Sequence, residues 1–447
     1  MKRILTIAGS DSGGGAGIQA DLKAITVLGG YGMSVITALN AQNTVGVRGI
    51  HQIPPSFIEA QIDAVIADIG VDAIKTGMLA ASEIVELVAR KIRQYAVRLV
   101  VVDPVMVAKS GDSLLAEEAR SSLKRHLVPL AYLITPNLPE ASVLSGMEVR
   151  TLDHMREAAA AIHGMGAAHV LIKGGHLEGD AVDLLYDGKK YIDFRVPRID
   201  TSNTHGTGCS YASAIATFLA RGMEVAEAVS EAKLFMTRSI RHALSLGAGH
   251  GPTNPYAWVA GEAERYQVLQ ELRKAFEIMR RARIGHLIPE VQTNLGYALS
   301  TPEGPEDVAA WPGRIVRFED SVAAVGFPSF GASRHVAKII MTAMLFDPKM
   351  RSAANIRFGE DVIEACRLAG LNVSSFDRSQ EPADVKAREG SSLSWGVDEC
   401  LRKGEGFPDI IFDRGDVGKE PMVRVLGADP VDVVQKMQRI AEHLPGR

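Results

Sequence analysis

The chain has 447 residues, of which 46% are hydrophobic and 23% charged, and its formal net charge at pH 7 is -4. At about 150 residues per domain, this length predicts two or three domains. The composition is that of a globular protein, and the small negative charge does not favour a nucleic-acid partner. The three cysteines, Cys209, Cys366 and Cys400, form no Cys-x-x-Cys pair, which favours a reducing compartment.

Nothing in the sequence predicts export or insertion into a membrane. The apolar run that starts at residue 4 is broken by polar residues and glycines within one strand length, so it predicts a first strand rather than a signal peptide. No stretch of 18 or more apolar residues occurs. We therefore expect a cytoplasmic protein with no membrane partner.

Short β-branched runs alternate with helical periods from residue 2 to about residue 242. Strands are predicted at 4–8, 73–76, 99–102, 132–134 and 170–172. Helical patterns at 82–94 and 113–126 flank the continuously apolar strand 99–102, which is typical of a parallel sheet covered on both faces. We predict a three-layer α/β/α sandwich that binds its ligands at the carboxyl ends of the strands.

Turn residues at 247–255 interrupt this alternation, and a new helical period follows at 262–283. We therefore place a first domain at 1–260 and a second, smaller α/β domain at 261–447. Strands in the second domain are predicted at 314–317, 322–325, 371–376, 409–412 and 422–426, and helices at 335–346, 360–369 and 430–443.

Two glycine-containing segments stand where a strand would pass into a helix. Residues 11–21 (DSGGGAGIQAD) would let a ligand approach the backbone, although a tight turn explains them equally well. Residues 203–210 (NTHGTGCS) precede a helix of small residues, where backbone N–H groups and the helix dipole favour an anion. Gly206, Thr207 and Gly208 are therefore predicted to stabilise a migrating phosphoryl group.

Cys209 stands in the first turn of that helix, where the same field favours a thiolate. We interpret it as the group that accepts the proton of an attacking substrate hydroxyl; the alternative is a buried structural cysteine. Phosphoryl transfer also needs cations and a metal. Asp103 and Glu140, at strand ends, are predicted to contact ATP and to hold Mg²⁺ through water, and Lys173 to reach the nucleotide phosphates. For each of these three the alternative is a surface salt bridge.

Six segments together resemble the hydroxymethylpyrimidine/phosphomethylpyrimidine kinases, a ribokinase-like family. They are IAGSD (7–11), GGGAGIQAD (13–21), TALNAQNT (37–44), KTGM (75–78), VDPV (102–105) and HGTGC (205–209). The resemblance spans about residues 1–258. It implies a ribokinase-like fold and two successive ATP-dependent phosphorylations at one site, first of a hydroxymethyl group and then of the resulting monophosphate.

The resemblance also implies roles for single residues. Gln42 would hydrogen-bond the aminopyrimidine, Gly9 and Met78 would line its ring pocket, and Asp21 is assigned to the substrate site. Cys209 would be the base, within an anion hole formed by residues 206–209.

One departure from the family is Asn40, where valine or threonine usually stands beside the pyrimidine. Pyridoxal kinases share the fold, so activity toward pyridoxine is an alternative, but residues 41–44 favour the pyrimidine. Related enzymes are often oligomeric, and a homo-oligomer is expected here too.

In the second domain, the turn GFPSFGASRH (326–335) runs into a helix capped by Ser333, which describes an anion site. Cationic donors for phosphate or pyrophosphate are Arg314, Arg334, His335, Arg357 and Arg378. A solvated helix face is the alternative for any one arginine. The charged loop DRGDVGKEP (413–421) is either a solvent turn or part of a site.

A second set of segments resembles the archaeal-type thiamine-phosphate synthases over about residues 264–447. They are GRIVR (313–317), GASRHVA (331–337), NIR (355–357), SFDR (375–378), WGV (395–397) and GDVGKEP (415–421). The resemblance implies that a hydroxymethylpyrimidine diphosphate is joined to a thiazole phosphate with release of pyrophosphate.

Loss of pyrophosphate leaves a stabilised cation, so the catalyst has mainly to neutralise the leaving group. Arg314 and His335 are predicted to do so, with Ser333 and Asn355 as supporting ligands. The alternative is a sensor module that binds thiamine phosphates without turnover. The sequence shows no helix-turn-helix pattern that would suggest a DNA-binding regulator.

Overall fold

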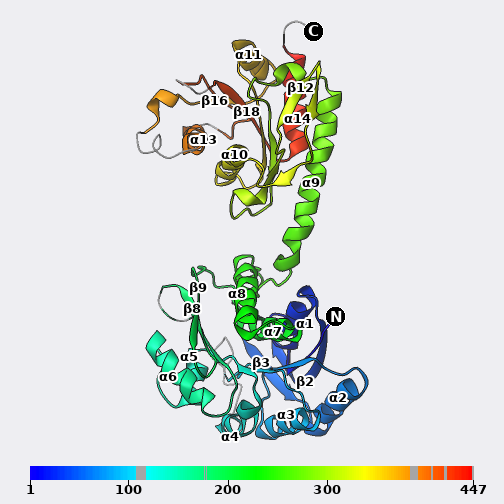
Figure 1. Ribbon diagram of the computed structural model, residues 1–447, viewed down its shortest axis with the longest axis vertical. Helices are drawn as coiled ribbons and strands as arrows, with labels where there is room; N and C mark the ends of the chain where they lie inside the picture. Colours follow the sequence, from blue (N-terminus) through cyan, green and yellow to red (C-terminus); the bar gives the residue numbers. More distant parts are fainter. Residues whose placement is uncertain are drawn as a thin grey trace. The chain divides into compact units, whose positions relative to one another are not determined.

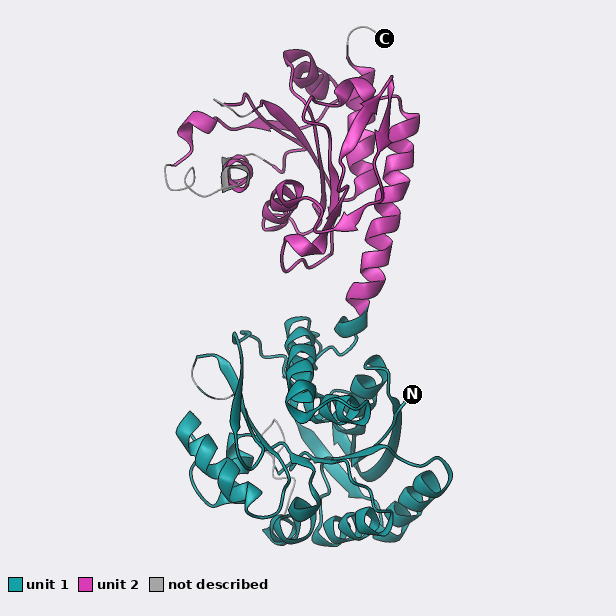
Figure 2. Ribbon diagram, viewed as in Figure 1, with its two compact units in different colours: residues 1–259 teal, residues 260–447 magenta. Residues whose placement is uncertain are grey.

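The computed structural model describes residues 1–106, 117–175, 177, 179–382, 391–403, 406–416 and 420–444. The chain divides into two compact units, residues 1–259 and 260–447 (Figure 2). Two parts of the sequence predictions lie outside the described residues: the start of the helix predicted at 113–126, and positions 417–419 of the charged loop.

Unit 1 is built on one nine-stranded sheet in the order β3-β2-β1-β4-β5-β6-β7-β8-β9 (Figure 1). The strands from β2 to β7 in that order are parallel neighbours, whereas β3, β8 and β9 pair antiparallel at the two edges. Their bounds are β1 Arg3–Asp11, β2 Tyr31–Gln42, β3 Val47–Gln52, β4 Ala73–Thr76, β5 Val100–Val102, β6 Leu133–Ile134, β7 Val170–Gly174, β8 Ala181–Tyr186 and β9 Tyr191–Val196.

Successive side chains of the central strands enter two different cores, because neighbouring residues of a strand point to opposite faces. Ile4 and Leu133 pack under one layer of helices, whereas their chain neighbours Leu5 and Ile134 pack under the other. The first layer is α1 (Gly17–Val27), α7 (Thr207–Ala220) and α8 (Val225–Arg241). The second is α2 (Pro55–Asp68), α3 (Ser82–Gln94), α4 (Glu117–Ser122), α5 (Leu138–Ser145) and α6 (Leu152–His163), with the short turns η1 (Leu123–Leu127) and η2 (Val128–Leu130). The predicted three-layer sandwich is confirmed.

All five strands predicted in unit 1 are present, and the helix predicted at 82–94 has those bounds. The sequence analysis did not predict β2 and β3, which form one edge of the sheet. In β3 no residue is buried, and β2 alternates buried with more exposed positions, so neither strand carries a continuous apolar run.

Unit 2 is a smaller α/β unit, as predicted, with a seven-stranded sheet in the order β14-β11-β10-β15-β18-β17-β16. Its neighbours are antiparallel except β16 and β17, and β12 and β13 form a separate hairpin. The bounds are β10 Leu295–Ala298, β11 Val308–Ala310, β12 Ile315–Phe318, β13 Ser321–Ala324, β14 Ser329–Phe330, β15 Ser352–Arg357, β16 Val373–Ser375, β17 Ile410–Asp413 and β18 Met422–Gly427. The short strands β10, β11, β14 and β15 were not predicted.

Helices cover both faces of this second sheet. One core lies under α9 (Ala257–Arg281), α11 (Glu360–Leu368) and α14 (Pro430–Glu442), and the other under α10 (Arg334–Met344) and α13 (Ser391–Lys403). Short 3-10 turns are η3 (Gly285–Leu287), η4 (Pro305–Asp307) and η5 (Arg378–Gln380). Of the helices that the structure describes, none is both long and apolar enough to cross a membrane.

Candidate active site

A cavity of about 580 Å³ opens in unit 1 at the carboxyl ends of the parallel strands. Asp11 ends β1, Asp103 follows β5 and Lys173 lies near the end of β7, and all three line the cavity. This is where an open parallel sheet binds its ligands. Of the residues predicted for the first domain, those that line the cavity are Gly9, Gln42, Met78, Asp103, Glu140, Lys173, Gly206, Thr207, Gly208 and Cys209.

The start of α7 forms one wall of the cavity. Its N-cap, Gly206, has φ 80°, and a Cβ there would come within 1.8 Å of the carbonyl oxygen of Gly15, so only glycine fits. The first i to i−4 hydrogen bond runs from Ser210 N–H to the Gly206 carbonyl, so the amides of Gly208 and Cys209 precede the helical ladder. No acidic residue stands in the first turn, which leaves this helix start suited to an anion.

Cys209 differs from expectation in its protonation. Burial raises the pKa of its thiol to about 11, against the positive charge of Lys75 and the Gly17 N–H, which lower it. The thiol is therefore neutral near pH 7, and the prediction that the helix dipole favours a thiolate is wrong. Desolvation outweighs a dipole effect of about 0.3–1 kcal/mol.

Asp21 and Lys75 form an ion pair with fully buried side chains. Lys75 Nζ lies 2.9 Å from each carboxylate oxygen of Asp21, which also accepts hydrogen bonds from Thr6 (2.6 Å) and Ser213 (2.8 Å). Burial alone would lower the pKa of Lys75, but the charge of Asp21 raises it, so the ammonium group keeps its proton. Asp21 does not line the cavity. The prediction that Asp21 binds the substrate is therefore corrected: its carboxylate is hydrogen-bonded to Thr6, Lys75 and Ser213 and supports the site from below.

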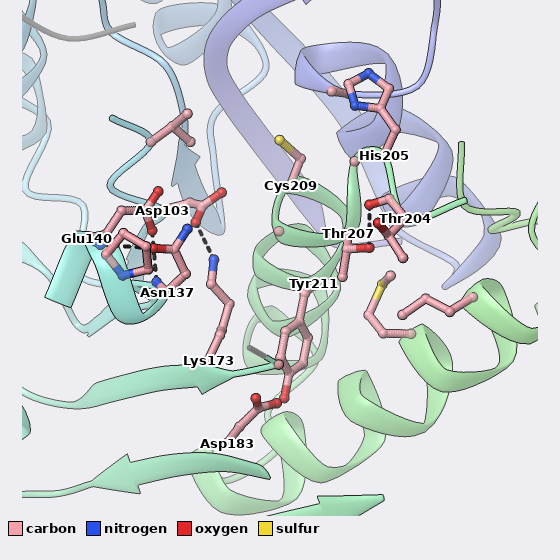
Figure 3. Close-up of a pocket in the computed structure, with 18 of the residues that line it drawn as sticks. Asp103, Asn137, Glu140, Lys173, Asp183, Thr204, His205, Thr207, Cys209 and Tyr211 are labelled. Carbon is pink, nitrogen blue, oxygen red and sulfur yellow. Dashed lines mark hydrogen bonds and ion pairs between the residues drawn. The ribbon is translucent and has the colours of Figure 1, made fainter. Parts of the chain in front are cut away.

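The opposite wall carries two acids and a lysine, which Figure 3 shows across the cavity from the start of α7. Lys173 Nζ lies 2.8 Å from Asp103 Oδ1. Glu140 belongs to a capping box of α5, in which its Oε2 accepts from Asn137 N–H at 2.8 Å. A Cβ added to Gly208 would lie 3.3 Å from Lys173 Nζ and 3.7 Å from Asp103 Oδ2, so the helix start faces this cluster at close range.

The carboxyl of Glu140 has a raised pKa. Burial raises its pKa to about 7, and the charge of Asp103 adds to this, while Lys173 lowers it. Within the described part of the chain, no group of three or more His, Cys, Asp and Glu side chains could hold a metal on its own. Two carboxylates that leave room for water and phosphate oxygens nevertheless suit Mg²⁺, which keeps most of its water shell.

Gly9, Asn40 and Met78 form a further part of the wall. A Cβ on Gly9 would lie 3.5 Å from both Asn40 Nδ2 and Met78 Sδ, which is ordinary contact, so the glycine keeps space open rather than avoiding a clash. Thr37 donates to the Met78 carbonyl at 2.7 Å and fixes that segment. Gln42 lies on the same strand as Asn40, two residues further on.

A hydrogen-bonded chain from Asp11 through His205 to Gln42 was missed by the sequence analysis. His205 Nε2 lies 3.0 Å from Asp11 Oδ2 and 3.3 Å from the Gln42 amide nitrogen. Burial would raise the pKa of Asp11, but hydrogen bonds from His205, Gly13 and Ala16 lower it, so Asp11 is ionised.

An ionised Asp11 requires Nε2 of His205 to carry the proton and donate it. One ring nitrogen cannot also accept from Gln42, so the Gln42 amide is expected to turn its oxygen to His205 and its NH₂ group to the cavity.

The glycine-rich loop holds Asp11 in place, and its residues Ala16 and Gly17 also line the cavity. Asp11 accepts backbone bonds from Gly13 (2.8 Å), Gly15 (3.1 Å) and Ala16 (2.8 Å), and a Cβ on Gly15 would come within 2.4 Å of the His205 ring. The turn-rich segment 247–254 also contributes, because Thr253 N–H donates to the His205 carbonyl. The histidine was visible inside the motif HGTGC, but its partner lies 194 residues away.

Another part of the cavity wall carries Asp183, Lys233 and Tyr211. Lys233 Nζ lies 2.6 Å from Asp183 Oδ2, and the Gly174 N–H donates to Asp183 Oδ1 at 3.1 Å. Burial, then the charge of Asp183, raises the pKa of Tyr211 well above its ordinary value. Apolar side chains that line the same cavity are Val196, Pro197, Ile199, Met236 and Ile240. None of these residues carried a sequence motif.

In unit 2, Arg314 and His335 are both exposed, but they lie at opposite ends of β11. Gly331, four residues before His335, donates to the carbonyl of Val308 at the start of that strand, whereas Arg314 follows the strand's end. The residue after Arg314, Ile315, packs into the core under α9. The helix that carries His335, α10, packs against the core on the other face of the sheet. Within one unit, the structure does not bring the two predicted residues together.

The two predicted supporting residues differ from each other. Ser333 caps α10 by accepting from Val336 N–H at 3.4 Å, as predicted. The side chain of Asn355 is engaged by protein: its Oδ1 accepts from Asn294 N–H at 2.7 Å, and its Nδ2 donates to the Gln292 carbonyl at 2.9 Å. Asn355 thereby joins β15 to the segment before β10, so its placement is structural.

Of the remaining predicted cations, Arg378 is buried rather than solvated. Its Nε lies 2.6 Å from Asp413 Oδ1, and Arg424 lies 2.8 Å from Asp413 Oδ2. Burial would raise the pKa of Asp413, but the two arginines lower it. Arg357 pairs with Asp361 at 2.5 Å, and Arg334 is exposed.

Two family models match the chain. Residues 11–254 match phosphomethylpyrimidine kinase, and residues 271–439 match thiamine-phosphate synthase ThiN. Thiamine biosynthesis bifunctional protein ThiED of Geobacter sulfurreducens is 58% identical over 252 residues, which are 56% of this chain and 51% of that protein. Hydroxymethylpyrimidine/phosphomethylpyrimidine kinase of Bacillus subtilis is 49% identical over 258 residues, which are 57% of this chain and 95% of that kinase.

Among solved structures, an ADP complex of Bacillus subtilis pyridoxal kinase is 45% identical to this chain, with a TM-score of 0.55. It covers 57% of this chain and 98% of its own. The ribokinase-like fold expected of the first domain is confirmed. The chain thus spans nearly all of the single-function kinases, but only about half the length of the bifunctional relative.

Proposed function

The chain belongs to the phosphomethylpyrimidine kinase family, and on that premise we propose that unit 1 transfers the γ-phosphoryl group of ATP to an aminopyrimidine alcohol and then to its monophosphate. The observation that carries this proposal is the approach of the α7 start to Asp103 and Lys173 within one cavity. A phosphoryl group placed between them would meet backbone amides on one side and an ammonium group on the other.

In each transfer, an oxygen of the substrate attacks the γ-phosphorus while the bond from that phosphorus to the bridging oxygen of ADP breaks. The amides of Gly208 and Cys209 and the ammonium group of Lys173 stabilise the charge on the phosphoryl oxygens. Cys209 first gives its own thiol proton to water, and the resulting thiolate accepts the hydroxyl proton of the alcohol as the new P–O bond forms. Burial raises the pKa of the thiol to about 11, so little thiolate is present near pH 7, but the thiolate that forms is a strong base.

Mg²⁺ would neutralise charge on the phosphate oxygens, and Asp103 and Glu140 would hold it through water. The charge of Lys75 lowers the pKa of Cys209 and so favours its thiolate, whereas the charges of Asp21 and Asp103 raise that pKa. The apolar residues that follow β9 and line α8 offer a surface for the base of the nucleotide.

The kinase proposal is tested by phosphorus NMR of the full-length protein with ATP, Mg²⁺ and the aminopyrimidine alcohol. We expect a phosphate monoester that is converted to a diphosphate. ATP hydrolysis without either product would refute the proposal. Cys209→Ala is expected to lower kcat by about 10²–10⁴-fold with little change in KM, as for loss of a general base.

A second candidate substrate is a pyridoxal-type alcohol, because a pyridoxal kinase is among the similar solved structures. The same apparatus would phosphorylate its hydroxymethyl group. Competition between the two alcohols, measured as the ratio of their kcat/KM values, decides which substrate the site prefers.

For unit 2 we propose the coupling of the pyrimidine diphosphate to a thiazole phosphate, with release of pyrophosphate. This reaction binds two anionic groups, and the separation of His335 from Arg314 suits two anion contacts rather than one. The strand β11 between them spans roughly 10 Å. His335 and Ser333, at the start of α10, would take one group and Arg314 the other.

The alternative for unit 2 is a module that binds thiamine phosphates without converting them. Arg314→Ala and His335→Ala distinguish the two: coupling activity at the wild-type level in both variants would refute the proposed roles. A catalytic unit is expected to lose kcat in at least one variant, whereas a sensor shows no thiamine phosphate formation even before mutation.

The cellular compartment, the partners and the oligomeric state of the enzyme are also part of this proposal. Cys209, Cys366 and Cys400 form no disulfide with one another, which suits a reducing cytoplasm. The expected partners are small molecules, namely ATP, the pyrimidine and the thiazole phosphate. A homo-oligomer is expected from the resemblance to related kinases, and light scattering of the purified chain tests it.

A further inference from the structure

Asp11, the last residue of β1, holds two strand-to-helix connections that are far apart in the sequence. Its Oδ1 accepts from Gly13 N–H, and its Oδ2 accepts from Gly15 N–H and Ala16 N–H, which fixes the glycine-rich loop before α1. Oδ2 also lies 3.0 Å from Nε2 of His205, the residue before the N-cap of α7. One carboxylate therefore joins the start of α1 to the start of α7.

The carboxylate of Asp11 is engaged by protein on all sides. Asp11 borders the cavity, but the residue is only 2% exposed. An ionised carboxylate has about four acceptor sites, and four N–H groups of the protein fill them. Burial would raise the pKa of Asp11, but these hydrogen bonds lower it, so the acceptor is charged and its bonds are stronger than neutral ones. This leaves Asp11 to act through the segments that it holds.

The two segments that Asp11 joins touch each other at the reacting end of the cavity. A Cβ on Gly206 would lie 1.8 Å from the Gly15 carbonyl oxygen, so the loop and the N-cap of α7 are in direct contact. Burial raises the pKa of the Cys209 thiol to about 11, and a hydrogen bond from the Gly17 N–H is among the interactions that lower it. A shift of the loop is therefore passed to the helix start.

The main chain of His205 is tied to a different segment from its ring. Its N–H donates to the Gly251 carbonyl at 3.0 Å, and its carbonyl accepts from Thr253 N–H at 3.1 Å. The ring makes the hydrogen bond to Asp11 and packs so closely on Gly15 that a Cβ there would lie 2.4 Å from it. Loss of the ring would leave the α7 start tied to the Gly251 segment but not to the carboxylate that holds the glycine-rich loop.

We propose that Asp11 is a positioning residue for phosphoryl transfer, which acts through His205 to hold the start of α7 against the migrating phosphoryl group. The inference rests on the proposed kinase function, since it names what aligns the anion-binding part of that site. The amides of Gly208 and Cys209 stabilise charge only at hydrogen-bond distance from the phosphoryl oxygens, and a displacement of about 1 Å can lower a rate about 10²-fold. Both transfers use this helix start, so misalignment should slow both.

The test cuts the link from each side. Asp11→Ala removes the carboxylate, His205→Leu removes the ring donor, and the double variant removes both. His205→Gln is the conservative variant, because its amide N–H can take the place of Nε2. Asp72→Ala is the matched control, because this aspartate accepts the backbone and side-chain N–H groups of Arg3 at the opposite end of β1.

With ATP, Mg²⁺ and the aminopyrimidine alcohol, we expect each single variant to lower kcat about 10- to 100-fold with less than about threefold change in KM. The double variant should be no slower than the slower single variant, because both changes break one link. His205→Gln should regain most of the lost kcat, and Asp72→Ala should match wild type.

Three results would overturn the inference: losses that multiply in the double variant, a wild-type kcat in either single variant, or a loss confined to the first of the two transfers. If Asp11→Ala does not fold, His205→Leu and His205→Gln carry the comparison. Equal kcat values in those two variants would then refute the role of the ring donor.

Hydrogen exchange of the ligand-free protein separates this inference from the kinase proposal. The N–H groups of His205 and Ser210 are protected by backbone hydrogen bonds. In Asp11→Ala and His205→Leu we expect peptides that cover residues 205–210 to exchange at least about tenfold faster, with residues 3–8 unchanged. Faster exchange supports the link even where wild type phosphorylates nothing. Unchanged exchange at 205–210 overturns the link even where the kinase is active.

Discussion

Replacing Glu140 by glutamine is expected to change how the stability of unit 1 depends on pH. Burial raises the pKa of this carboxyl to about 7 from an ordinary value of 4.5. A shift of about 2.5 units corresponds to about 3 kcal/mol between the two protonation states. Glutamine has a similar shape and no titratable group, so it removes this contribution at every pH.

The sign of the effect follows from the raised pKa. Below pH 4.5 the carboxyl is neutral in the folded and unfolded chain, and wild type and Glu140→Gln respond alike to pH. Between pH 4.5 and 7 only the unfolded chain ionises, so the free energy of unfolding of wild type falls relative to the variant by up to about 1.4 kcal/mol per pH unit. Above pH 7 the accumulated difference levels off at about 3 kcal/mol.

The assay is urea unfolding of wild type and Glu140→Gln at pH 5, 6, 7 and 8 in the presence of a chelator. The free energies of unfolding of the two proteins are compared for the transition that the substitution shifts. Glu148→Gln, at an exposed position near the end of the same helix, is the control and should follow wild type. Added Mg²⁺ stabilises the ionised carboxylate and should narrow the difference between wild type and Glu140→Gln above pH 7. If the free energies of unfolding of wild type and Glu140→Gln differ by the same amount from pH 5 to pH 8, the raised pKa of Glu140 is refuted.

Three further substitutions test particular contacts. Asp21→Asn leaves the fully buried ammonium group of Lys75 without its counter-charge and should destabilise unit 1 by about 3–5 kcal/mol in denaturant unfolding; a loss below 1 kcal/mol would show that the pair is dispensable. Gly206→Ala places a Cβ 1.8 Å from the Gly15 carbonyl and should lower kinase kcat by more than about 100-fold with the far-UV spectrum retained, so wild-type turnover would contradict the geometry of the α7 start. Asp413→Asn weakens the pairing of two buried arginines and should lower the stability of unit 2 by about 3–5 kcal/mol, with unchanged kinase activity as the internal control.

The parts of the fold that the sequence predicted correctly are those with a strong local pattern. Strand β4 and helix α3 have the predicted bounds because an apolar run or an apolar helical stripe lies between turn residues. Strands β2 and β3 were missed because an edge pair that is half exposed has no such run. Strands β10, β11, β14 and β15 were missed because their sequences, LGYA, VAA, SF and SAANIR, contain no run of β-branched residues.

In the candidate site too, residues of one motif were predicted correctly, whereas contacts between residues far apart in the sequence were not. Residues within one motif, such as Gly206 to Cys209, line the cavity as predicted, because a helix start brings them together by itself. The pairing of His205 with Asp11 depends on how strands and helices pack, and no spacing in the sequence encodes it. Asp21 was misplaced for that reason, since Lys75, which occupies its carboxylate, lies 54 residues away.

Protonation was the property least accessible from the sequence. The helix dipole at Cys209 could be predicted from the motif, but the larger effect of burial could not, because burial depends on the whole layer of helices above the sheet. The raised pKa of Glu140 has the same origin.

The most direct test of the central claim is a coupled assay of the full-length chain with ATP, Mg²⁺, the aminopyrimidine alcohol and thiazole phosphate, with products separated by chromatography. We expect thiamine phosphate to form without any added enzyme, and Cys209→Ala to slow its formation by about 10²–10⁴-fold unless pyrimidine diphosphate is supplied. Accumulation of pyrimidine diphosphate that thiazole phosphate does not consume would contradict the proposed role of unit 2, and the absence of any phosphorylated pyrimidine would contradict that of unit 1.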